Sequence, residues 1–140
     1  MNPELLIGMK YRLGSNPVDH GTADCLSLAR TVLSWYGIPT PEPQRSWYRR
    51  LRQNDYAVFK EELERWGTKV TGLDSGVVAL CKTDNGSALA TYWEEGWLSF
   101  VGSEVVWSPI GALEVRALYY PRKWSYAKRS ELTNKSIGHL

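Results

Sequence analysis

Residues 21–39 read GTADCLSLARTVLSWYGIP, and this stretch decides how the first half of the chain folds. Thr22 is a suitable N-cap, and apolar side chains then recur at the i, i+3, i+4 and i+7 spacing of a helix over 23–36. Gly37 stands where a helix-ending glycine is expected, and the prolines that follow it prevent continuation. Cys25 is therefore predicted to lie in the first turn of a helix.

Outside this stretch, helices are expected before residue 67 and strands after it. The segments 44–53 and 55–67 read as two more short helices, and NPELLIGMKYRLG at the N-terminus reads as another that ends near residue 8. Short β-rich runs then alternate with turn signals: GVVALCKT, SALATYW, GWLSFVG, EVVWSP and EVRALYYP. The sequence thus predicts an α+β fold, with N-terminal helices packed on a small antiparallel β-sheet.

The 140 residues are expected to form one domain over 1–121, followed by a C-terminal arm over 122–140. The arm is polar and basic, and it carries aromatic residues but no apolar periodicity. Two alternatives stay open for it, disorder or ordering on a partner. The candidate partner-binding residues stand at its start: Arg122, Lys123, Trp124 and Tyr126.

Composition excludes several functional classes. The net charge of +2 is too small to indicate nucleic-acid binding, and the four arginines of RSWYRRLRQ read as a solvated helix face. No apolar run approaches the roughly 18 residues of a membrane span. The N-terminus lacks the pattern of a signal peptide, so synthesis in the cytoplasm is expected. The two cysteines have no metal-ligand spacing, and neither a metal nor a cofactor is expected.

Cys25 has two interpretations from its position alone. Unpaired backbone N–H groups and the helix dipole stabilise a thiolate at a helix start, as a catalytic nucleophile requires. Alternatively, Cys25 is a small apolar residue on the buried face of its helix. Cys81 stands within an apolar strand and is interpreted as a core thiol.

A resemblance favours the first interpretation. Residues 11–41, YRLGSNPVDHGTADCLSLARTVLSWYGIPTP, resemble the signature of the NlpC-type cell-wall cysteine peptidases. That signature has a tyrosine, a glycine-containing loop, an Asp-Cys pair that opens a helix, and then Gly and Pro. The matching residues are Tyr11, Gly14, Asp24, Cys25, Leu28, Gly37 and Pro39. Residues 72–102 are similar to the family's second block. The resemblance implies a papain-like fold with Tyr11 and Asp24 in the cleft beside Cys25.

The sequence departs from the family where the catalytic base is expected. Alignment on the family's histidine-bearing strand places Ala88 at the histidine position and Ser99 at the position of the residue that orients it. The chain's histidines are His20 and His139. His20 precedes Cys25 by five residues and is the substitute candidate for the base, although it also reads as an ordinary polar loop residue.

Small relatives of this kind resemble proteins encoded beside bacteriophage tail genes. The resemblance therefore implies a degenerate peptidase domain that serves as a structural or docking component of a phage tail or baseplate. Its partners would be tail or baseplate proteins, and its location the virion. One alternative is an active cysteine peptidase or amidase that cleaves peptidoglycan stem peptides with a non-standard base. A third is a cytoplasmic thiol hydrolase, so enzyme activity stays an open question.

Overall fold

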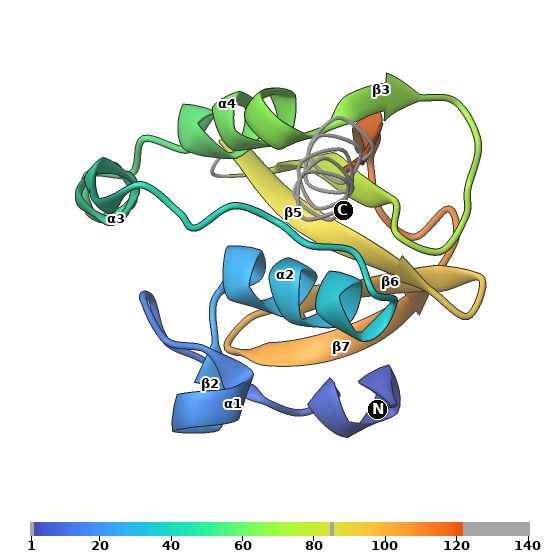
Figure 1. Ribbon diagram of the computed structural model, residues 1–140, viewed down its shortest axis with the longest axis horizontal. Coiled ribbons are helices and arrows are strands. Elements are labelled where there is room, and N and C mark those ends of the chain that lie inside the picture. The colour runs from blue at the N-terminus through green and yellow to red at the C-terminus, as the bar shows by residue number, and fades with distance from the viewer. Residues whose placement is uncertain (1, 85, 122–140) are drawn as a thin grey trace, which may run out of the picture.

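A computed structural model describes residues 2–84 and 86–121. Its main element is one curled, mixed sheet of eight strands in the order β2-β1-β7-β6-β5-β4-β8-β3 (Figure 1). The strands are β1 (Lys10–Tyr11), β2 (Thr22–Ala23), β3 (Thr68–Val70), β4 (Val78–Thr83), β5 (Gly86–Trp93), β6 (Gly96–Val101), β7 (Glu104–Pro109) and β8 (Val115–Tyr120). Strands β1 and β2 pair in parallel, and all the other neighbours are antiparallel.

The helices of the described residues are short. They are the 3-10 helix η1 (Pro3–Leu6) and the α-helices α1 (Pro17–His20), α2 (Cys25–Trp35), α3 (Arg45–Arg52) and α4 (Ala57–Trp66). Helices α2 and α4 cover the same face of the sheet (Figure 1). The packing of α2 and α4 on this face therefore determines which residues lie near Cys25.

The expectation of helices packed on a small antiparallel sheet, in a papain-like NlpC-type fold, is wrong. The described chain is built around a curled eight-stranded mixed sheet, with four short α-helices and one 3-10 helix beside it. The expected sheet lacked β1, β2 and β3, which have only two or three residues each. Such short strands carry no visible alternation, and they form because longer partners such as β7 and β8 offer free backbone groups.

Side-chain alternation gives the two faces of the sheet separate cores. On the helix-covered face, Val78 and Leu80 of β4 and Leu89 of β5 pack against α2 and α4. On the other face, Ala79 and Cys81 of β4 pack against side chains from neighbouring strands and loops. Any residue of β4 or β5 can therefore be assigned to the helix side or to the opposite side from its register.

Helix α2 begins at Cys25, two residues later than predicted, because Asp24 is its N-cap. The proposed cap Thr22 lies in β2 instead, where it pairs with Lys10 of β1. The helix ends at Trp35, and Gly37 follows with a φ of 77°. Only glycine adopts this left-handed conformation without strain, so the predicted stop is confirmed.

A two-residue turn joins β5 to β6. Glu94 and Glu95 have φ values of 50° and 58°, as in a type I′ turn. Left-handed backbone is unfavourable for glutamate, and the usual residues of this turn are Asn and Gly. The indole of Trp107 on β7 donates a hydrogen bond of 3.0 Å to the Trp93 carbonyl at this turn.

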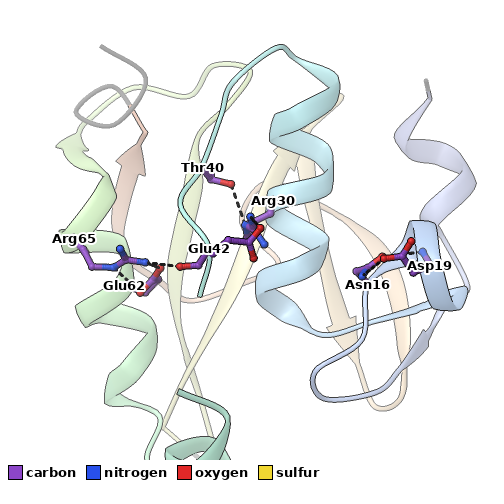
Figure 2. A network of polar contacts seen from close by, with 7 residues as sticks. All are labelled: Asn16, Asp19, Arg30, Thr40, Glu42, Glu62 and Arg65. Atoms are coloured by element: carbon purple, nitrogen blue, oxygen red, sulfur yellow. Dashed lines mark hydrogen bonds and ion pairs between the residues drawn. The ribbon is translucent and has the colours of Figure 1, made fainter. Parts of the chain in front are cut away.

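A network of polar contacts joins the loop after α2 to helices α2 and α4 (Figure 2). Arg30 of α2 donates to the Thr40 hydroxyl at 3.1 Å and lies 3.3 Å from the Glu42 carboxylate. Arg65 of α4 donates to the Glu42 carbonyl at 3.1 Å and pairs with the buried Glu62. These contacts fix α2 and α4 relative to each other on the sheet.

Candidate functional site

Asp24 holds the start of α2 with both of its carboxylate oxygens. Oδ1 accepts a hydrogen bond from the Ser27 N–H at 2.8 Å, and the Ser27 hydroxyl accepts one from the Asp24 N–H at 2.9 Å. This reciprocal pair is a capping box. Oδ2 accepts from the Gly14 N–H at 2.9 Å and thereby anchors the preceding loop. The residue is buried, and its hydrogen bonds stabilise the local fold.

Cys25 is half-buried, and its side chain packs against the helix-covered core. It packs beside the cluster that contains Leu26, Ala29 and Leu89, and the Leu89 N–H is its hydrogen-bonding group on β5. Burial raises the pKa of the thiol to about 12. The Leu89 N–H lowers this pKa in part, and the Asp24 carboxylate raises it. The thiol is therefore protonated at neutral pH, which is the opposite of an activated nucleophile.

Tyr11 is 44% exposed, and it lies near enough to Cys25 and Asp24 for their charges to act on its phenol. Its ring packs edge-on against Phe100 with centroids 5.1 Å apart. Burial raises the pKa of Tyr11 to about 12, and Cys25 and Asp24 raise it further by their negative forms. The structure thus brings Tyr11, Asp24 and Cys25 together, and the neutral phenol is available as a hydrogen-bond donor.

Leu89, and not Ala88, is the β5 residue that faces Cys25. Ala88 pairs with Cys81, whose side chain belongs to the core on the opposite face. Leu89 pairs with Leu80 on the helix-covered face. A shift of one residue along a strand changes the face, so the alignment of Ala88 with a histidine does not place that side chain beside the thiol.

Ser99 lies on β6, one residue beyond Leu98, which packs under α2. Alternation therefore directs Ser99 to the face opposite α2. It is 6% exposed, and its hydroxyl has no hydrogen-bond partner among the described residues. The structure does not bring Ser99 to Cys25.

His20 is the last residue of α1 and is exposed. Its Nδ1 accepts a hydrogen bond of 3.0 Å from the Asn16 N–H, within the same turn of chain. The other residues that act on the pKa of Cys25 are Leu89, Asp24 and Cys81, and His20 is not one of them. This placement is that of a polar loop residue.

The remaining candidates lie outside the described residues. These are Arg122, Lys123, Trp124 and Tyr126 of the arm, together with His139. Within 2–84 and 86–121 no group of three or more acidic, histidine or cysteine side chains could hold a metal ion. In the same part of the chain, no helix is both long and apolar enough to cross a bilayer.

Sequence reasoning missed a groove of about 500 Å³ beside the start of α4. Its cationic lining residues Lys60, Lys69 and Arg116 come from α4, β3 and β8. They are far apart in the sequence, and no motif links them. Only the pairing of β3 with β8 brings two of these segments together.

Comparison of the sequence with family models and with curated proteins finds no match. The chemistry of the site therefore has to be judged from its own geometry. That geometry supplies a protonated thiol, a neutral phenol and a carboxylate engaged in helix capping, with Leu89 facing the thiol on β5.

Proposed function

We propose that this protein is a non-catalytic docking component, with a bacteriophage tail or baseplate as its assembly. The observation that carries the non-catalytic part is the Cys25 thiol, whose pKa burial raises to about 12. A cysteine peptidase needs a thiolate and a base that shuttles the proton to the leaving group. Leu89 occupies the β5 position that faces the thiol and has no proton to exchange.

Asp24 supports the same proposal. Its two oxygens already accept backbone hydrogen bonds from Ser27 and Gly14. A carboxylate committed in this way stabilises the helix start and is not free to act as a general base. The residues near Cys25 therefore serve the fold, and the resemblance of residues 11–41 to cell-wall peptidases supplies the phage context of the proposal.

A cleavage assay tests the non-catalytic part. Purified peptidoglycan is incubated with the wild type, with Cys25→Ala and with His20→Ala, and newly released amino groups are measured. We expect all three proteins to give the buffer baseline. Release by the wild type that Cys25→Ala abolishes would establish a cysteine peptidase or amidase. If the release of amino groups were lost in His20→Ala as well, His20 would be identified as the base.

Co-expression tests the docking part. The chain is produced together with the tail or baseplate proteins encoded by neighbouring genes, and complexes are resolved by size-exclusion chromatography. We expect a stable complex that the Cys25→Ala variant forms equally well, because the thiol is not part of the surface. Failure to form a complex with any of these proteins would contradict the docking role.

A further inference from the structure

The groove beside α4 combines a charged rim with an apolar floor. Leu80 of β4 and Ala117 of β8 belong to the helix-side core and line it from below. Tyr56, at the N-cap of α4, forms a side wall, and its hydroxyl donates to the Asn54 side chain at 3.1 Å. Apolar walls with a few convergent polar groups are the usual make-up of a small-molecule site, and about 500 Å³ is within its usual size.

The charge of the lining is predominantly positive. Lys60, Lys69 and Arg116 are its cations, and Asp55 is its carboxylate. Asp55 is engaged elsewhere, because Arg50 donates to it at 2.7 Å. Lys60 lies 4.0 Å from Glu64 on the exposed side of α4, which is a weak, solvent-screened pair. Lys69 and Arg116 therefore supply most of the uncompensated charge.

A β-bulge sets the position of Arg116. On β8, Ala117 pairs with Leu80 and Val115 pairs with Cys81, so Arg116 is the extra residue between two consecutive β4 partners. A bulge redirects the side chain of its extra residue, and bulges are common beside functional sites. Lys69 reaches the same groove from β3, where it pairs with Tyr119, another lining residue. Strand β3 thus presents Lys69 to the groove through regular pairing, and β8 presents Arg116 to the same groove through a β-bulge.

We propose that this groove binds a small organic phosphate, with the phosphate between Lys69 and Arg116 and the organic part over Leu80 and Ala117. Arginine matches phosphate oxygens with its planar fork, and lysine adds a mobile point charge. An apolar floor favours an ester over the bare ion, since the ester's organic part buries surface that inorganic phosphate lacks. This site goes beyond the proposed docking function and does not depend on it.

Isothermal titration calorimetry on the full chain tests the site with four probes. ADP represents an organic phosphate, inorganic pyrophosphate the bare anion, and adenosine the organic part alone. A hexaglutamate peptide represents an acidic protein segment. We expect ADP to bind more tightly than pyrophosphate, and adenosine to bind negligibly. Tighter binding of pyrophosphate or of the peptide than of ADP would overturn the proposal, as would the absence of ADP binding at millimolar concentration.

Charge-removing variants locate the binding. Arg116→Gln and Lys69→Gln should each weaken ADP binding by about tenfold, the size expected for one charge-assisted hydrogen bond. Arg116→Lys keeps the charge but loses the planar fork, so an intermediate loss is expected. The matched control is Arg49→Gln on α3, an exposed position outside the groove that changes the net charge equally. Equal losses in the control and the groove variants would show non-specific attraction and overturn the site.

Discussion

Two helices begin on the same face of the sheet, and their first turns are built differently. At α2, Asp24 and Ser27 form a closed capping box, and the adjacent thiol is directed into the core. At α4, the N-cap Tyr56 makes no capping hydrogen bond with its side chain, and the turn borders an open, cationic groove. The helix start that resembles an enzyme's active site is the one whose polar groups are already satisfied.

The comparison shows that a sequence motif typical of an active site does not by itself provide polar groups that are free to bind a ligand. A carboxylate whose two oxygens both accept backbone hydrogen bonds stabilises its own fold and has less capacity left for a ligand. The exposed cations around the groove beside α4 keep their capacity to bind a ligand. The predictions below therefore compare the two helix starts, with the largest expected effect first.

Asp24→Ala should destabilise the protein by about 2 kcal/mol, because it removes the helix cap and the hydrogen bonds that the Ser27 and Gly14 N–H groups donate to the carboxylate. Urea denaturation measures the loss. Asp84→Ala is the matched control, since Asp84 is an exposed carboxylate at the end of the β4 segment. Equal costs for the two variants would show that the capping box contributes nothing, and the contrast between the helix starts would fail.

Cys25→Ala should cost about 1 kcal/mol, since only the packing of one sulfur atom is lost. It should also change the pH dependence of stability. The folded thiol has its pKa raised to about 12, whereas an unfolded cysteine titrates near 8.5, so the folded state retains the proton longer. The contribution of this group is complete below about pH 8.5 and is lost as the pH rises toward 12.

Thermal melts between pH 8 and 11 measure this slope. The wild type should lose stability more steeply with rising pH than Cys25→Ala. Cys25→Ser, which keeps a similar shape without a titrating thiol in this range, should follow the alanine variant. Parallel curves for all three proteins would mean that the thiol is not buried as described.

Asp55→Ala at the start of α4 should have a smaller effect than Asp24→Ala. Asp55 accepts from Arg50 and from the Ala57 N–H at 3.3 Å, but both contacts are open to solvent. Water replaces partners lost at an exposed position. Calorimetric melts in low and high salt check this, because any stabilising effect of the ion pair should shrink with salt. A loss as large as that of Asp24→Ala would contradict the comparison.

Ala88→His should leave the alkylation rate of Cys25 unchanged, because the new side chain stands on the face opposite the thiol. The rate is measured with iodoacetamide on a Cys81→Ala background at mildly alkaline pH. Leu89→His, which points toward Cys25, is the matched variant and should speed alkylation if the protein remains folded. Acceleration by Ala88→His would show that the register of β5 differs from the one described.

The sequence predicted the elements that carry a long local pattern. The β-rich runs that form β4 to β8 are separated by turn signals, and α2 has apolar residues at helical spacing along its whole length. These segments were therefore identifiable from the sequence. The cap of α2 was misplaced because Thr22 and Asp24 are both good caps. Asp24 forms the cap with Ser27, while Thr22 is engaged in the pairing of β2 with β1, which is a tertiary contact.

The site was harder to predict, for the same physical reason. Tyr11 and Asp24 lie beside Cys25, but the state of the thiol depends on burial, which residue spacing does not reveal. Which of Ala88 and Leu89 faces the helix depends on strand register. The groove cations lie on three elements, and Arg116 reaches its place only through a bulge that the sequence does not announce.

The glutamate turn between β5 and β6 has a consequence for the order of folding. Two left-handed glutamates disfavour this hairpin in the isolated segment, and the indole of Trp107 reaches it only when β7 has joined. The β5–β6 pair should therefore form together with β7, late in the folding reaction rather than as an early nucleus. Glu95→Gly relieves one strained residue, and in stopped-flow measurements it should slow unfolding while leaving the refolding rate nearly unchanged. Faster refolding would place this hairpin within the folding nucleus and contradict its late formation.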